Sequence, residues 1–184
     1  MVVFPGAGSS ADHSTLVAIE RALDPIPVAR CDFPYRRAGR RFPDRSDVLE
    51  RTVVDETVSF ARQRGGSTSS IVVGGRSMGG RMCSMAVAAG LDVAGLVCVS
   101  YPLHPPTRPE RVRTGHLPLL RVPSLFVSGT RDAFATPDEL REALRLPAVT
   151  PELRLLEGAR HDLGGRDAEV AWIIAEWVGR LRRD

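Results

Sequence analysis

The sequence contains no lysine, so all 25 of its basic residues are arginines. The formal net charge is only +3 at pH 7. The one dense basic group, Arg36–Arg37 with Arg40–Arg41, is short and lacks the interleaved aromatic side chains on which nucleic-acid bases stack. We therefore interpret it as a solvated loop in preference to a phosphate-binding patch, and we expect no nucleic-acid partner.

Cysteine and histidine are also scarce. The three cysteines, Cys31, Cys83 and Cys98, are odd in number, form no C-x-x-C motif and each lie in an apolar stretch. This pattern predicts buried, reduced thiols and no disulfide framework. The four histidines are scattered without the spacing of metal ligands, so we expect neither a metal nor another cofactor.

A long hydrophobic run is missing as well. No apolar stretch approaches the ~20 residues that cross a membrane, and the first residues lack the basic and apolar regions of a secretory signal. We therefore expect no membrane contact and a cytoplasmic location. No repeat, low-complexity tract or linker divides the 184 residues. The sequence predicts a single domain over residues 1–184.

The sequence does contain a regular alternation of short apolar strands with amphipathic helices. Several strands are apolar throughout, which is typical of a parallel sheet covered by helices on both faces. We predict a doubly wound α/β fold with a mostly parallel sheet of about six strands. The expected strands are Val2–Phe4, Pro27–Asp32, Ser70–Val73, Gly95–Ser100, Ser124–Ser128 and Glu152–Leu156. The first expected helix is capped by Asp12 and has an apolar side of Leu16, Ile19, Ala22 and Leu23. The second is expected to run from Asp47 to Gly65, and three more are expected over Met78–Ala89, Asp138–Leu144 and Ala168–Leu181.

The motif that carries chemistry follows the third expected strand. Gly75–Arg76–Ser77–Met78–Gly79 is a G-x-S-x-G pattern between a strand and a helix, which is the context of a nucleophile elbow. The tight turn needs small residues two positions before and after the serine, and Gly75 and Gly79 provide them. G-x-S-x-G alone is a weak signal, since a structural turn has the same composition. The pattern makes Ser77 a candidate nucleophile.

A serine nucleophile needs a base and an acid that orients the base. In this fold they follow the serine in the order acid, then histidine. Asp132 follows the strand Ser124–Ser128, and His161 follows the next strand, Glu152–Leu156. The carboxyl ends of parallel strands meet at one edge, so the three side chains should converge. Asp162 competes for the acid role, but it adjoins His161 and would point away from that ring. We predict His161 as base and Asp132 as acid.

An oxyanion hole requires two N–H donors near the Ser77 hydroxyl. Met78, the residue after the nucleophile, is expected to supply one, and Ala7 in the loop after the first strand the other. The chain order places the switch point of the sheet between the strands that carry this loop and Ser77. For substrate contacts we consider Gly6, Tyr35, Arg76 and His104, with loop packing as the alternative for Tyr35 and His104.

The sequence resembles the small lid-less α/β-hydrolases near the dienelactone-hydrolase group, in the branch that also contains a subunit of a histone-acetyltransferase complex. Ser77, Asp132 and His161 match the triad of that family. The resemblance implies an α/β-hydrolase fold without a cap domain. The segments that carry it are Phe4–Gly8, Asp32–Tyr35, Gly75–Arg81, Tyr101–Pro106, Gly129–Asp132 and Arg160–His161.

Two features depart from that family. Pro5 stands where relatives usually have a histidine, and two antiparallel strands that precede the first strand in relatives are absent. Either the chain is short by design or its start lies upstream of Met1. If it starts at Met1, Pro27–Asp32 is an edge strand with unpaired backbone groups, which predicts a homodimer through that edge or a marginally stable monomer.

These observations favour a serine hydrolase that cleaves small esters, thioesters or lactones through an acyl-enzyme on Ser77. The alternative is a catalytically weak hydrolase scaffold that serves as an interaction module. A peptidase would normally carry a cap or propeller to screen its substrates. The Arg36–Arg41 group could favour a carboxylate-bearing substrate. The natural substrate and its acyl-chain length cannot be deduced from the sequence.

Overall fold

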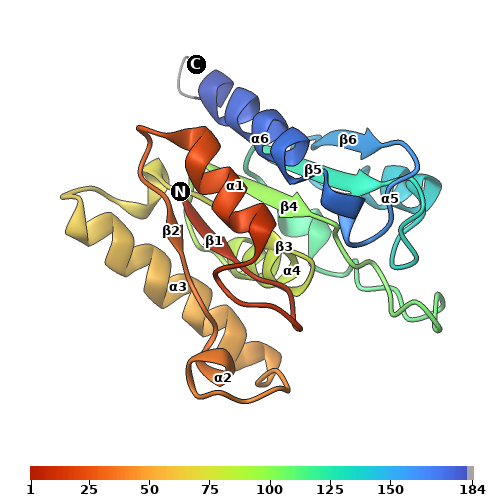
Figure 1. Cartoon of the computed structure of the whole chain (residues 1–184), viewed down its shortest axis with the longest axis horizontal. Coiled ribbons are helices and arrows are strands. Elements are labelled where there is room, and N and C mark those ends of the chain that lie inside the picture. Colours follow the sequence, from red (N-terminus) through yellow and green to blue (C-terminus); the bar gives the residue numbers. More distant parts are fainter. Residues whose placement is uncertain (182–184) are drawn as a thin grey trace.

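The computed structural model describes residues 1–181 as one six-stranded sheet with helices on both faces (Figure 1). All five strand pairs are parallel, and the strand order is β2-β1-β3-β4-β5-β6. The strands are β1 (Val2–Phe4), β2 (Ala29–Arg30), β3 (Val72–Arg76), β4 (Gly95–Val99), β5 (Ser124–Gly129) and β6 (Glu152–Leu156). The doubly wound parallel α/β fold predicted from the sequence is confirmed.

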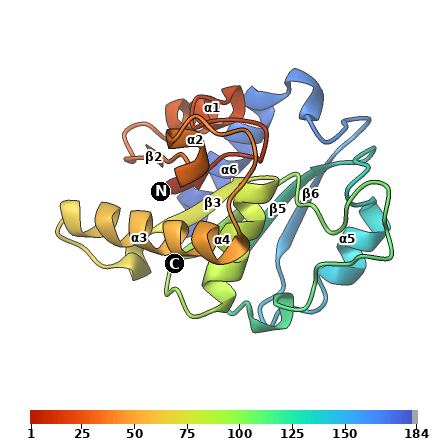
Figure 2. The same ribbon diagram turned by 90° about the horizontal axis from the view of Figure 1, so that it is seen from below.

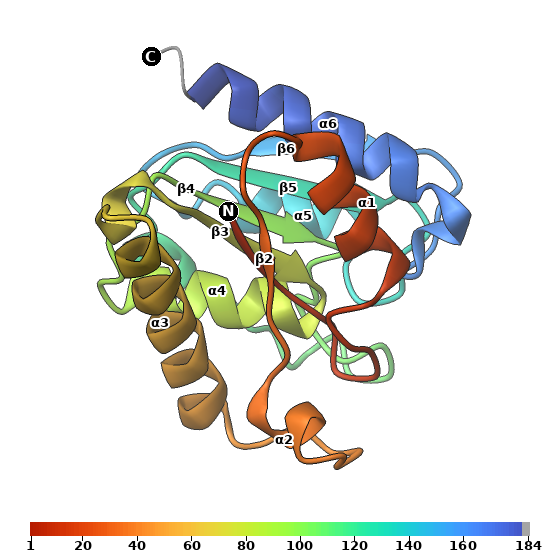
Figure 3. The same cartoon turned by 60° about the vertical axis from the view of Figure 1, so that its left-hand side comes forward.

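Residues 1–181 contain six α-helices, five of which lie between strands and one after the last strand. They are α1 (Ser14–Leu23), α2 (Pro34–Arg37), α3 (Ser46–Gln63), α4 (Met78–Ala88), α5 (Pro137–Ala143) and α6 (Asp167–Leu181). Figure 3 shows α1 and α6 on one side of the sheet and α3 and α4 on the other, and Figure 2 shows α5 on the side of α4. None of the helices in residues 1–181 is both long and apolar enough to cross a bilayer.

Two apolar cores lie on the two faces of the sheet. Central strands are buried from end to end, because alternate side chains enter one core or the other: Val73 and Leu96 face the α3–α4 side, and Val72 and Val97 face the α1–α6 side. Trp177 of α6 closes the second core. The central strands are therefore held rigidly, and so are the loops at their carboxyl ends.

Several predicted elements differ from the structure at their ends, and one helix was not predicted. The second strand is two residues long instead of the predicted Pro27–Asp32. The third begins at Val72 instead of Ser70 and runs on to Arg76. Helix α2 lies inside the expected loop Phe33–Arg45, with Pro34 in its first turn, where the fixed φ of proline favours a helix. Helix α1 is capped by His13 and not by Asp12, because the Asp12 carboxylate binds the Arg30 guanidinium instead.

The switch point of the sheet lies between β1 and β3, as the chain order predicts. From β1 the chain crosses to β2 on one side, and from β2 it returns to β3 on the other side. Ligands of open α/β sheets bind in the crevice at this point, outside the carboxyl ends of the strands. The loops after β1 and β3 carry Pro5–Gly8 and Ser77, so both predicted parts of the site meet there.

Candidate active site

Ser77 occupies a strained turn between β3 and α4. Its φ of 51° and ψ of −117° are unusual for a residue with a side chain. The turn is possible because its flanks are glycines: a Cβ on Gly75 would lie 2.5 Å from the Phe4 carbonyl oxygen, and one on Gly79 would collide with the same oxygen. The Ser77 N–H donates to the Val99 carbonyl at 2.7 Å. The sequence motif therefore forms the tight elbow that its glycines predict.

The structure brings Ser77, His161 and Asp132 into one hydrogen-bonded chain. His161 Nε2 lies 2.9 Å from Ser77 Oγ, and His161 Nδ1 lies 2.8 Å from Asp132 Oδ2 and 3.0 Å from Oδ1. The residues come from the carboxyl ends of three strands, β3, β5 and β6. This geometry can move a proton from the hydroxyl to the imidazole while the carboxylate fixes the ring.

The surroundings of Asp132 hold its carboxylate in place. Its side chain is fully buried, whereas that of His161 is 21% exposed. Oδ1 accepts a hydrogen bond from the Phe134 N–H at 2.8 Å, and Oδ2 accepts a longer one from Ser128 Oγ at 3.5 Å. The Phe134 ring also lies against the imidazole, with ring centroids 4.1 Å apart. The imidazole is thus oriented through both its Nδ1 atom and its face.

The loop Pro5–Gly8 after β1 lies beside the elbow. The N–H of Ala7 has no acceptor within the described chain, and the N–H of Met78 begins helix α4, where no intrahelical acceptor is available. Tyr35 Oη donates to the Ala7 carbonyl oxygen at 2.9 Å, which ties the loop to helix α2. Two backbone donors therefore remain open near the Ser77 hydroxyl.

An open cleft of about 470 Å³ lies over Ser77. It is lined by Gly6–Ser9, His13, Arg76, Ser77, Phe134 and His161. Of the four residues considered for substrate contacts, the structure places Gly6 and Arg76 in this cleft. Asp132 lies behind His161 and not in the cleft wall.

The other two candidates, Tyr35 and His104, do not line the cleft. The Tyr35 ring is fully buried in the core, stacked on Phe33, and only its hydroxyl acts on the site through the Ala7 carbonyl. His104 is 5% exposed, bonds to Glu139 at 3.3 Å and lines a separate cavity against α5. Neither side chain reaches the cleft, which favours the packing role that the sequence analysis kept as the alternative for both residues.

The arginine group of residues 36–41 also lies outside the cleft. Arg37 pairs with Glu56 of α3, and Arg40 pairs with Asp44 at 2.7 Å. Exposed pairs of this kind are worth little stability, and they leave no arginine of this group in the cleft wall.

Sequence reasoning missed three residues of the cleft, Ser9, His13 and Phe134. Phe134 lies two positions after Asp132 in a tight turn, and nothing in the local sequence distinguishes it from a packing aromatic. His13 reaches the cleft only because it caps α1, with its Nδ1 accepting from the Thr15 N–H. A strand-end position next to the expected acid was the one available signal for Phe134.

Possible ligands for a metal are dispersed. Within residues 1–181, no group of three His, Cys, Asp or Glu side chains is close enough together to hold an ion. Cys31, Cys83 and Cys98 are buried and unpaired, as predicted. Burial raises the pKa of the Cys31 thiol to about 12, so it is not a thiolate nucleophile at neutral pH.

A family model described as an alpha/beta hydrolase domain matches residues 1–171. The chain belongs to this family. Among solved structures, Est1E from Butyrivibrio proteoclasticus superposes with a TM-score of 0.78 at 14% identity, over 100% of this chain and 88% of that one. A dienelactone hydrolase from Anabaena variabilis superposes with a TM-score of 0.74 at 20% identity, over 97% of this chain and 85% of that one.

A third similar structure is an α/β serine hydrolase without a lid from Xanthomonas campestris. Its TM-score is 0.74 at 18% identity, over 97% of this chain and 81% of that one. At these identities the three likenesses establish the α/β-hydrolase fold. They agree with the resemblance to lid-less hydrolases and dienelactone hydrolase that the motifs indicated.

Proposed function

We propose that this α/β-hydrolase is a serine hydrolase that cleaves small ester-like substrates, namely esters, thioesters or lactones. The observation that carries the proposal is the unbroken chain of hydrogen bonds from Ser77 Oγ through His161 to Asp132. Family membership and the similar folds of Est1E and of a serine hydrolase without a lid are consistent with it. The open cleft without a cap suits a small substrate better than a folded one.

The first half-reaction forms an acyl-enzyme. Ser77 Oγ attacks the carbonyl carbon while His161 Nε2 takes the hydroxyl proton, and Asp132 stabilises the imidazolium through Nδ1–H. The N–H groups of Ala7 and Met78 donate to the oxyanion of the tetrahedral intermediate. His161 then gives its proton to the leaving alcohol or thiol, and the C–O or C–S bond breaks.

The second half-reaction releases the acid. Water attacks the acyl carbon with His161 as general base, the intermediate collapses, and the proton returns from His161 to Ser77 Oγ. The buried position of Asp132 keeps water from competing for its oxygens, so the imidazole remains oriented through both halves. Orientation by Asp132 therefore serves each proton transfer.

The first prediction tests the nucleophile and the base. Ser77→Ala and His161→Ala should each lower kcat on 4-nitrophenyl acetate by about 10³-fold or more, because the residues act as a unit. A fluorophosphonate probe should label the wild type at Ser77 and fail to label Ser77→Ala. The measurements are steady-state hydrolysis and mass spectrometry of the labelled peptide.

The matched control is Ser69→Ala, which removes an exposed serine outside the cleft and should leave both hydrolysis and labelling unchanged. Hydrolysis within tenfold of wild type in Ser77→Ala would reject the assignment. A wild type that neither hydrolyses esters nor takes the probe would favour the interaction-module alternative.

A further inference from the structure

Arg76 is a buried cation in the wall of the cleft. It is the last residue of β3 and directly precedes Ser77, and its side chain turns into the cleft between the Gly6 loop and His161. Only 9% of the residue is exposed. The guanidinium is therefore largely withdrawn from water, so the free-energy cost of burying its charge depends on its hydrogen-bond partners.

Most donors of Arg76 have no partner among the residues that the structure describes. A guanidinium has five N–H donors, and within residues 1–181 one bond is present, from Nη2 to the His161 carbonyl oxygen at 3.0 Å. Nε is buried without an acceptor. No carboxylate among the described residues forms an ion pair with Arg76, whereas the less buried Arg30 pairs with both Asp12 and Glu20. A buried guanidinium without a counter-ion costs free energy.

The free donors face the place where a substrate must lie. Nη1 of Arg76 and Cβ of Ser77 lie 3.4 and 3.5 Å from the position that a Cβ on Gly6 would take. The two atoms are therefore at most 6.9 Å apart, beside the loop that holds the proposed oxyanion donor. A group bound at Nη1 would be a few bonds from a carbonyl carbon attacked by Ser77.

The charges around Arg76 favour the binding of one anion in the cleft. Burial lowers the pKa of Arg76, while Asp162, Asp167 and Asp132 raise it from a distance. His13, the other titratable group on this side of the cleft, has a lowered pKa because of its burial and the Arg76 charge, so it is neutral near pH 7. The cleft wall thus holds one unpaired positive charge, and a substrate carboxylate matches it in charge and in planar shape.

We propose that Arg76 is a specificity residue that binds a free carboxylate on the substrate, so that the preferred ester carries a carboxylate a few bonds from the scissile carbonyl. The inference rests on the proposed ester hydrolysis and narrows its substrate class. Binding of the carboxylate supplies the missing counter-ion to Arg76 while the ester carbonyl lies between Ser77 and the backbone donors.

The test compares two esters of equal chain length, mono-4-nitrophenyl adipate and 4-nitrophenyl hexanoate. The readout is the ratio of their kcat/KM values. In the wild type the adipate ester should be favoured, and Arg76→Gln should lower the ratio at least tenfold, mainly through KM of the adipate ester. Arg76→Lys keeps the positive charge but not the planar set of N–H donors, and its ratio should lie between those of Arg76→Gln and the wild type. Arg160→Gln, which removes an exposed arginine next to His161, should leave the ratio within twofold.

A second readout needs no turnover. Free hexanoate should slow fluorophosphonate labelling of the wild type more than the neutral hexanamide does, and this difference should vanish in Arg76→Gln. If Arg76→Gln slows both esters alike and hexanoate protects no better than hexanamide, Arg76 only positions the His161 loop and the proposal is wrong. If the wild type hydrolyses neither ester and takes no label, the proposed function itself fails.

Discussion

Three polar residues below the cleft satisfy one another's hydrogen bonds. Ser84 Oγ lies 2.8 Å from His116 Nε2 and 3.1 Å from Tyr101 Oη, and Tyr101 Oη lies 3.0 Å from His116 Nε2. Burial, with a smaller contribution from the Arg81 charge, lowers the pKa of His116 to about 4. This imidazole is therefore neutral in the folded protein, although in the unfolded chain it would protonate at about pH 6.5.

We predict that His116 makes the protein less stable in mild acid. Between about pH 6.5 and 4 the unfolded chain binds a proton at this residue and the folded protein does not. The free energy of unfolding should therefore fall as the pH drops through that window, by up to about 3 kcal/mol. Urea unfolding at several pH values measures it.

His116→Gln removes the titrating group and should flatten that part of the pH dependence relative to wild type. Tyr101→Phe leaves the imidazole in place and should keep the wild-type slope. An identical slope in wild type and His116→Gln would mean that the imidazole is protonated in the folded protein.

At the level of elements, most of the fold could be predicted because local and global signals agree. Continuous apolar runs marked the central strands, and the G-x-S-x-G motif between a strand and a helix located the elbow that the structure shows. The edge strand is shorter than predicted. It pairs over only two residues, and the apolar residues Cys31 and Phe33 enter the core from the loop that follows.

The roles of individual loop residues could not be predicted for a different reason. Whether Tyr35 or His104 faces the cleft depends on how segments distant in sequence meet, and local composition contains no information on that. A buried phenol that holds the Ala7 carbonyl looks the same in sequence as one that touches a substrate. The tertiary contact at 2.9 Å decides between these interpretations.

We predict that Tyr35→Phe impairs catalysis through the Ala7 loop. The change removes the hydroxyl that holds the Ala7 carbonyl and leaves the buried ring in place, so the N–H of Ala7 should be less well fixed. We expect kcat to fall by about tenfold with little change in KM, and stability to fall by about 1 kcal/mol. Steady-state kinetics and urea unfolding measure the two effects.

Tyr101→Phe is the matched control for this variant. It also removes one buried phenolic hydroxyl, here from the Ser84–His116 cluster, and should lower stability by a similar amount. Its kcat should remain that of the wild type. Equal losses of kcat in the two variants would indicate a general effect of instability and not a role of the Ala7 loop.

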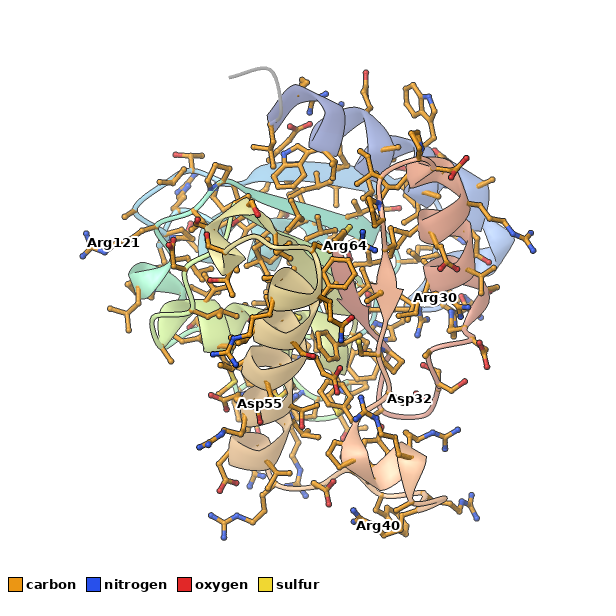
Figure 4. The ribbon with its side chains drawn as sticks, turned by 90° about the vertical axis from the view of Figure 1, so that its left-hand side faces the viewer. Arg30, Asp32, Arg40, Asp55, Arg64 and Arg121 are labelled. Carbon is orange, nitrogen blue, oxygen red and sulfur yellow. The ribbon has the colours of Figure 1, made fainter. Side chains whose placement is uncertain are left out.

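At the scale of the whole molecule, the parallel sheet gathers the site and leaves β2 and β6 as its two edge strands. Gly6, Ser77, Asp132 and His161 are spread over most of the chain but leave their strands at the same rim. At the opposite end of the strand order from β6, the strand β2 has no neighbour beyond it within residues 1–181; Figure 4 views this edge, with Arg30 and Asp32 labelled. A homodimer through this edge was one of the two alternatives that the sequence predicted.

The structure changes how that dimer must be tested. The N–H groups of Ala29 and Cys31 donate inward to Met1 and Val3, so a proline at either position would break the sheet itself. Arg30 is the residue of β2 whose backbone faces outward. Its side chain is tied to Asp12 and Glu20 at 2.8 Å each, which places charge along the free edge.

We expect this short, charged edge to keep the wild type monomeric at micromolar concentration, and Arg30→Val to promote self-association. Valine removes both ion pairs, favours extended backbone and adds apolar area worth about 25 cal/mol per Å² when it is buried. Light scattering on dilution compares the two proteins, with Arg121→Val as the control for loss of an exposed arginine elsewhere. A wild-type dimer that Arg30→Pro converts to a folded monomer would instead establish pairing through β2, because proline removes the outward donor that such pairing needs.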